Sequence, residues 1–191
     1  KAISSSEMMP SERTTVVVSE KGWIRAGKGT IDGTSLSYKN GDTFLKSAEG
    51  MSNDIISIID AQGKAYNVSH KDIPNARGYG EPLSSKINIG GTSVVDVIIA
   101  KPDDDYLFVS SSGYGFYFKG SDLETKMKAG KKMFSLKDNE TIKSIQKIDK
   151  ENRLCLTTEQ GRVIAFDMEE CQYRAKGKGI QLIKIGKNDN L

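Results

Sequence analysis

A short pattern recurs four times along this chain of 191 residues: an apolar run, a three-residue polar step and then a glycine. The four glycines are Gly22, Gly63, Gly113 and Gly161, which lie 41, 50 and 48 residues apart. The Ser, Asp or Thr side chain three residues before each glycine favours the start of a tight turn. The glycine then supplies the positive φ that closes a hairpin through a one-residue bulge. Repetition with this period predicts an array of β-rich units.

Each unit continues in the same way. A short apolar strand follows the glycine. In three units a polar residue three positions before an acid then predicts a short helical turn, at Ser69 and Asp72, Ser121 and Glu124, and Asp167 and Glu170. A basic segment that contains glycine comes next. These basic segments are RAGKG (25–29), ARGYG (76–80), KMKAGKK (126–132) and YRAKGKG (173–179).

Additional strands bring the content of each unit to about four, as in a propeller blade. We predict leading hairpins in which 94–100 and 142–148 fold back on the strands that follow them. Closing strands are predicted at 43–48, 86–89, 133–136 and 180–185. The sequence thus predicts an all-β fold, a propeller-like array of about four four-stranded blades, with an open or incomplete ring as one alternative.

The ends and the unit boundaries follow from the same pattern. Residues 1–13 are polar and Ser-rich, so we interpret them as a linker, and we interpret the chain as a piece of a larger protein because residue 1 is not Met. The β-domain is predicted over 14–191. Its approximate units are 14–50, 51–93, 94–141 and 142–191.

The residue types exclude most catalytic and metal sites. His70 is the only histidine, so a site with two histidines is impossible within the chain. Asp103 to Asp105 follow Pro102 in a predicted hairpin tip and lack the spacing of a calcium loop. Cys155 and Cys171 have no metal-like spacing and indicate a reduced compartment. The Gly-x-Gly pairs precede neither a dinucleotide helix nor a P-loop Lys-Ser/Thr. We therefore predict no catalytic residue, metal or cofactor in this segment.

Positive charge is clustered although the net charge is only +3. The segment 126–132 holds four lysines and no acid, and 173–187 holds five basic residues and no acid. Acids gather elsewhere, at 103–105 and 167–170. Clustered cations in phased loops are typical of surfaces that bind a nucleic-acid backbone, and solvated charged turns are the alternative.

Several runs together resemble a known family. VVVSEKGWIRAGKG, LSYKNGD, ARGYGEPL, SSSGYGFYF, AGKK and KGKG, in this order, are similar to the C-terminal domain of the A subunit of bacterial topoisomerase IV. The resemblance covers about residues 14–185. It implies a β-pinwheel, a ring of blades that exchange strands, whose outer rim binds and bends duplex DNA. The related gyrase A domain carries a box close to QRRGGKG in its first blade. The nearest match here, QYRAKGKG (172–179), lies in the last unit, which favours topoisomerase IV.

The resemblance also implies a parent enzyme and its surroundings. The parent would be an ATP-dependent type IIA topoisomerase that uses ATP and Mg²⁺ outside this segment. It would be an A2B2 assembly of the A subunit with an ATPase B subunit, in the bacterial cytoplasm at the nucleoid, and the family also allows peripheral membrane association. Two other functions stay open: a gyrase-type domain that wraps DNA to drive negative supercoiling, and a propeller-like protein-interaction module.

The predicted interface binds double-stranded DNA through phosphates, with little sequence preference. Glycine lets backbone N–H groups approach phosphates, and Lys and Arg release counterions. The predicted DNA-binding residues are Arg25, Lys28, Arg77, Lys128, Lys131, Lys132, Arg174, Lys176 and Lys178. Lys64 and Arg162, which directly follow turn glycines, are two further candidates.

Overall fold

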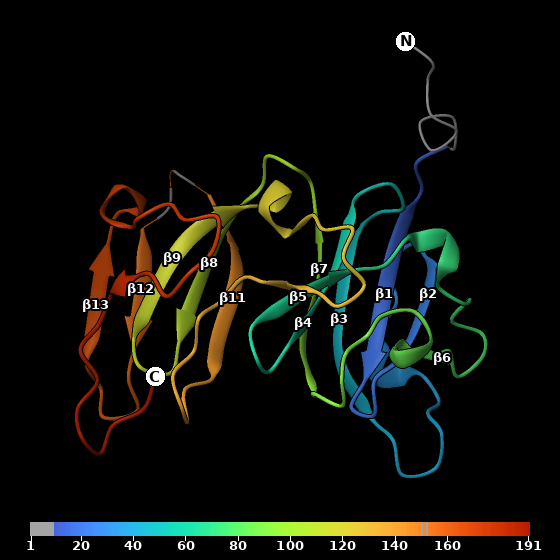
Figure 1. Ribbon diagram of the computed structural model, residues 1–191, viewed down its shortest axis with the longest axis horizontal. Coiled ribbons are helices and arrows are strands. Elements are labelled where there is room, and N and C mark those ends of the chain that lie inside the picture. Colours follow the sequence, from blue (N-terminus) through green and yellow to red (C-terminus); the bar gives the residue numbers. More distant parts are fainter. Residues whose placement is uncertain (1–9, 150, 152) are drawn as a thin grey trace.

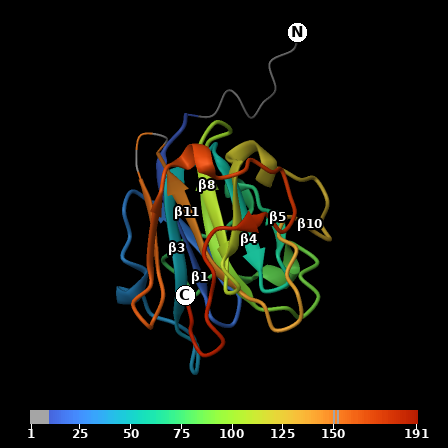
Figure 2. The same ribbon diagram turned by 90° about the vertical axis from the view of Figure 1, so that its left-hand side faces the viewer.

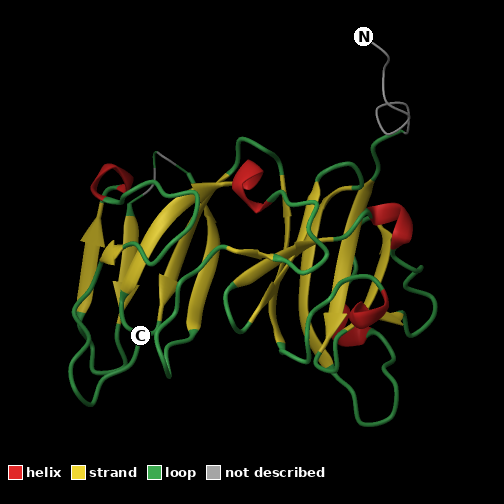
Figure 3. Ribbon diagram, viewed as in Figure 1, coloured by secondary structure: helices red, strands yellow, loops and turns green. Residues whose placement is uncertain are grey.

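The computed structural model describes residues 10–149, 151 and 153–191, and most of its regular structure is β-strand (Figures 1 and 3). The strands are β1 (Arg13–Ser19), β2 (Trp23–Lys28), β3 (Phe44–Met51), β4 (Ile55–Asp60), β5 (Lys64–Asn67), β6 (Glu81–Pro82), β7 (Val94–Ala100), β8 (Asp105–Ser110), β9 (Tyr114–Lys119), β10 (Lys131–Lys132), β11 (Ile142–Ile148), β12 (Leu154–Thr157), β13 (Val163–Phe166) and β14 (Ile180–Gln181). Short 3-10 helices connect them, namely η1 (Gly33–Ser35), η2 (His70–Asp72), η3 (Leu83–Ser85), η4 (Gly120–Leu123) and η5 (Met168–Glu170). Residues 1–9 of the expected linker lie outside the described residues. Within the described part, no helix has the length and apolar character needed to cross a membrane.

The strands form three four-stranded sheets and one two-stranded hairpin. Their orders are β3-β1-β2-β6, β10-β5-β4-β7, β11-β8-β9-β14 and β12-β13. The sheets lie in a row along the longest axis of the molecule, with β6 near one end and β13 at the other (Figure 1). Figure 2 looks along this row from the β13 end. The predicted all-β, propeller-like array is confirmed, and its first and last sheets lie far apart rather than closing a ring.

Each four-stranded sheet is built around one hairpin, β1-β2, β4-β5 or β8-β9. On one side the hairpin pairs with an inner strand (β3, β7 or β11), and these three strands line a groove of about 750 Å³. On the other side it pairs with an outer strand (β6, β10 or β14). The outer strand comes after the next hairpin in the sequence, so the chain itself links neighbouring sheets.

This exchange corrects two predictions from the sequence. Segments 94–100 and 142–148 do not fold back on the strands that follow them, because β7 pairs with β4 and β11 pairs with β8. The strands predicted at 86–89 and 133–136 are also wrong. The outer strands are instead the two-residue β6 and β10. Each ends because the next backbone N–H donates to the carbonyl of the turn glycine in the hairpin with which the strand pairs. The short helical turns predicted from Ser69, Ser121 and Asp167 are present as η2, η4 and η5.

The core lies between successive sheets, in three clusters of buried side chains. Along β8, Tyr106 and Phe108 pack in the second cluster, whereas Leu107 and Val109 pack in the third. Successive side chains of a strand point to opposite faces. A strand between two sheets is therefore apolar on both faces, which explains the unbroken run YLFV and the run IISII, which only Ser57 interrupts. The terminal strand β12 is covered on one face only, and it alternates half-buried leucines with exposed residues.

The turn glycines hold the array together. Gly22, Gly63, Gly113 and Gly161 all have positive φ, between 76° and 81°, as the sequence predicts. In the three four-stranded sheets, the glycine carbonyl accepts an N–H from the residue that follows the outer strand. The bonds are Leu83 N to Gly22 O at 2.8 Å, Met133 N to Gly63 O at 2.9 Å and Leu182 N to Gly113 O at 2.8 Å. We call this repeated contact the glycine clasp.

A pair of glycine substitutions tests the clasp. A Cβ at Gly113 would lie 2.2 Å from the carbonyl oxygen of Ile183, whereas a Cβ at Gly161, with almost the same φ, meets nothing within 4 Å. We expect Gly161→Ala to lower the free energy of unfolding by about 1–2 kcal/mol, the cost of the left-handed conformation. Gly113→Ala should cost about 1–3 kcal/mol more, because the clasp must open. Urea unfolding followed by circular dichroism measures both, and equal losses would contradict the clasp.

Candidate nucleic-acid interface

The outer strands β6, β10 and β14 mark one edge of the array, and a basic loop precedes each of them. We define the basic loops as residues 76–80, 126–130 and 173–179. The first and third are anchored alike. Ala76 N donates to Ala26 O on β2, and Arg174 N donates to Tyr117 O on β9, with N···O distances of 2.8 and 2.9 Å. The hairpins therefore place these two loops at equivalent positions of their sheets.

The second basic loop is held by different groups at the same edge. Thr125 N donates to the Asn67 side chain at the end of β5, and Lys128 O accepts from Asn88 N at 2.8 Å. Gly130 closes the loop with a φ of 77° and a hydrogen bond to Met127 O. All three basic loops thus lie beside the outer edge, as the phased sequence pattern requires.

Four predicted cations are exposed in these loops: Arg77, Lys128, Arg174 and Lys176. The Arg174 guanidinium donates to the Gln172 amide oxygen through two N–H groups, at 2.9 and 2.7 Å, and keeps its other donors for a ligand. Planar guanidinium groups and ammonium groups at an exposed edge are suited to phosphate oxygens.

Strand β10 brings two more predicted residues together. Lys132 lies directly opposite Lys64 in the β10–β5 pair, and its ammonium group donates to Gln62 O. Lys131 is half-buried, and its Nζ donates to Asp122 O at 2.6 Å. Lys132 and Lys64 therefore extend the positive edge, while Lys131 also anchors η4 to the outer strand.

Lys178 has an environment that the sequence did not indicate. Its Nζ lies 3.6 Å from the centre of the Tyr114 ring, a cation–π contact. Desolvation and the nearby Lys137 lower the pKa of Lys178, while Glu140 acts in the opposite direction. Two ammonium groups close together favour an anion between them.

Arg25 is the clear correction to the predicted set. Its side chain is buried, with 3% of its surface exposed. The guanidinium donates to Gly78 O at 2.6 Å and to Ser37 O at 2.9 Å, and it lies over the Tyr38 ring at 4.6 Å. Its alternating place on β2 points it beneath two loops, so Arg25 positions the first basic loop instead of meeting DNA.

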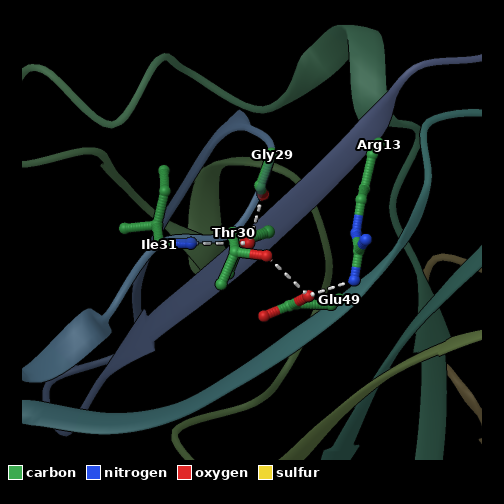
Figure 4. A network of polar contacts seen from close by, with 6 residues as sticks. Arg13, Gly29, Thr30, Ile31 and Glu49 are labelled. Atoms are coloured by element: carbon green, nitrogen blue, oxygen red, sulfur yellow. Dashed lines mark hydrogen bonds and ion pairs between the residues drawn. The ribbon is translucent and has the colours of Figure 1, made fainter.

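Lys28 and Arg162 lie outside the three basic loops. Lys28 is exposed but pairs with Glu12 at 2.9 Å. It lies beside a network in which the Glu49 carboxylate accepts from both Arg13 and Thr30 (Figure 4). Acids thus offset the cation at this place. Arg162 is exposed on the terminal hairpin and donates to Lys184 O at 3.3 Å.

Sequence reasoning missed Lys39. Its Nζ lies 3.6 Å from the centre of the Trp23 ring, and Trp23 directly follows a turn glycine, as Tyr114 does. The segment 39–42 forms a turn whose Asp42 carboxylate accepts from Lys21 N at 3.0 Å. The run KNGD signals such a turn, but only the fold shows that it places an exposed lysine beside the first sheet.

The acidic turn at 103–105 lies toward the inner strands. Lys147 on the inner strand β11 pairs with Asp104 at 2.7 Å, in the turn that the sequence predicted at 103–105. Burial opposes ionisation of Asp104, but hydrogen bonds from Lys147 and the Lys101 N–H hold its pKa below the usual value. In the described ranges, no group of three or more His, Cys, Asp or Glu side chains is arranged to hold a metal ion.

Comparison with known proteins gives consistent matches. A family model described as the DNA gyrase C-terminal domain, a beta-propeller, matches residues 104–149 and 152–191. The A subunit of DNA topoisomerase 4 from Pseudomonas aeruginosa is 41% identical, and the match covers 97% of this chain and 25% of that protein. The chain therefore spans about a quarter of the length of the curated relatives it matches.

Solved structures agree. The E. coli ParC C-terminal domain is similar with a TM-score of 0.86 and 33% identity, over 94% of this chain and 77% of that one. A DNA gyrase A C-terminal domain has a TM-score of 0.70 at 19% identity, over 94% and 63% of the two chains, which shows a shared fold.

Substitution of two arginines tests their different roles. Arg25→Met removes two hydrogen bonds made by a buried charged group to the carbonyls of Gly78 and Ser37, so we expect the free energy of unfolding to fall by about 3 kcal/mol. Arg77→Met, on the exposed loop, should change it by no more than about 0.5 kcal/mol. Urea titration of the two variants is the measurement. If both unfold at the midpoint of the wild type, Arg25 does not anchor the loop.

Proposed function

Because this chain belongs to the family of C-terminal domains of bacterial topoisomerase IV A subunits, which are related to those of gyrase A, we propose that it binds and bends duplex DNA. The observation that supports this most is the repetition of an exposed basic loop beside the outer strand of three successive sheets. A duplex that follows this edge meets Arg77, Lys128 and Arg174 in turn.

The loops favour phosphate contact over base reading. Lys and Arg release counterions when they neutralise phosphates, and backbone contacts of this kind carry no sequence information. The loops hold no Asn or Gln side chain to read adenine and no Asp or Glu side chain to read cytosine. Bending a site of 20–30 base pairs costs about 1–6 kcal/mol, and the additional phosphate contacts along a curved edge offset that cost.

In the whole protein, the domain would hold or orient DNA for strand passage by the parent topoisomerase, in decatenation and in relaxation of supercoils. We place the ATP and Mg²⁺ chemistry, and the partner ATPase B subunit, outside this segment. The whole A subunit would work at the nucleoid of a bacterial cell.

One observation keeps the gyrase-type function as a second candidate. The matching family model is that of the gyrase domain, and it covers the half of the chain that carries QYRAKGKG (172–179). A wrapping domain changes the linking number of a nicked plasmid that is closed by ligase in its presence. A bending domain leaves it nearly unchanged, and we expect the latter result because the first unit holds no box close to QRRGGKG.

Charge removal at one residue per loop tests the DNA path. The wild-type chain should bind random-sequence duplex with a slope of log K against log salt of about −5 if six phosphates are neutralised. The triple variant Arg77→Gln, Lys128→Gln, Arg174→Gln should reduce the slope by about three units, one for each lost contact. Fluorescence anisotropy of a labelled duplex at several salt concentrations gives both slopes.

The matched control is Lys143→Gln, an exposed lysine on the inner strand β11. It should leave affinity and slope unchanged. Salt-independent binding, or no binding by the wild type, would contradict the proposed function and favour a protein-interaction module. An unchanged slope in a folded triple variant would instead move the DNA path away from the basic loops.

A further inference from the structure

Each basic loop also exposes one large apolar side chain. Tyr79 is 51% exposed, Met127 is 57% exposed and Tyr173 is 44% exposed. The only other large apolar side chain exposed among the described residues is Val163, at 65%, on β13. Single exposed apolar residues are common on protein surfaces. Here three of the four share the loops that carry the outer-edge cations.

The backbone of each loop fixes the position from which the apolar side chain projects. Tyr79 follows Gly78, whose carbonyl is held by Arg25, and it borders a groove between the first basic loop and residues 35–37. Met127 begins the turn that Gly130 closes, with lysines on both sides. These two side chains are presented by ordered turns while their surfaces stay open to a ligand.

Tyr173 is held most firmly. Its hydroxyl donates to the Asp122 carboxylate, with O···O distances of 3.2 and 3.0 Å, and its ring contacts the Tyr117 ring with centroids 5.5 Å apart. One face of the ring is thereby supported, and the exposed part lies beside Arg174. An ordered apolar group next to a cation fits a ligand that alternates anionic and apolar surface.

Duplex DNA has that alternation, because deoxyribose and base-pair edges lie between its phosphates. We propose that Tyr79, Met127 and Tyr173 pack against sugars and minor-groove edges of the duplex, one from each basic loop, and support its bending. This rests on the proposed function of the outer edge. Apolar side chains at minor-groove steps lower the resistance of DNA to bending. The contacts add affinity that salt does not screen, since no counterion is released by them.

The experiment separates apolar from ionic contact by the shape of the salt titration. The double variant Tyr79→Ser, Met127→Ser should weaken binding to a random-sequence duplex by about fivefold per residue at every salt concentration, from the apolar area lost. Its slope of log K against log salt should equal that of the wild type. The matched control Val163→Ser removes an equally exposed apolar group outside the loops and should bind as the wild type does.

A measurement of DNA bending and two variants of Tyr173 complete the test. Energy transfer between dyes on the two ends of the duplex should fall in the double variant at saturating protein, and not in Val163→Ser. Tyr173→Phe keeps the ring and should retain binding, whereas Tyr173→Ser should weaken it. Circular dichroism confirms that each variant is folded.

The outcomes are distinct. Equal affinity and equal energy transfer for the wild type and the double variant would overturn the inference while the proposed function stands. Weaker binding by the double variant with a shallower slope of log K against log salt would mean that the substitutions had displaced the lysines and arginines of the loops. That result would also overturn the inference. Absence of salt-dependent binding by the wild type would refute the proposed function itself.

Discussion

The structure depends on one repeated contact, the acceptance of a backbone N–H by the carbonyl of a turn glycine. Each clasp joins a hairpin to the residue after an outer strand that belongs to the next repeat. Buried backbone groups need such partners. At Gly63 and Gly113 the close approach is possible because glycine has no Cβ, which would lie 2.2 Å from the carbonyl oxygen of Phe134 or Ile183, whereas a Cβ at Gly22 would meet nothing within 4 Å. The clasp fixes the end of the outer strand, and the basic loop at its other end is fixed with it.

This arrangement explains how a chain of nearly balanced charge presents a positive edge. The basic loops are the segments that connect a hairpin with the outer strand of the preceding sheet, so every exchange of strands delivers one loop to the same side. On the inner side, Lys147 of β11 pairs with Asp104 in the turn before β8. Topology thus places the three basic loops on one side of the array.

Arg25 and Lys39 show the limits of reasoning from composition and spacing. Both belong to the first repeat, and Arg25 lies in its basic segment, RAGKG (25–29). The period of β2 places Arg25 beneath the loops, where two carbonyls and the Tyr38 ring surround its guanidinium. Lys39 comes from an ordinary turn and reaches the surface beside Trp23. The residue type alone does not show whether a basic side chain is exposed or buried. Its burial in the fold decides whether it can contact a ligand or instead positions a loop.

The sequence by itself determined the repeat, the four turn glycines, the 3-10 helices η2, η4 and η5 and the segments that carry the basic loops. These features are local, because they follow from φ preferences, capping side chains and strand patterns within a few residues. The tertiary structure alone decided which strands pair. Val94–Ala100 has the pattern of a hairpin partner for the strand that follows it, yet it pairs with β4. A strand between two sheets is apolar on both faces, so its hydrophobic pattern does not indicate which strand it pairs with. Burial of Arg25 against Gly78 and the place of Lys39 beside Trp23 were likewise decided by the tertiary structure, since both depend on contacts between separate segments of the chain.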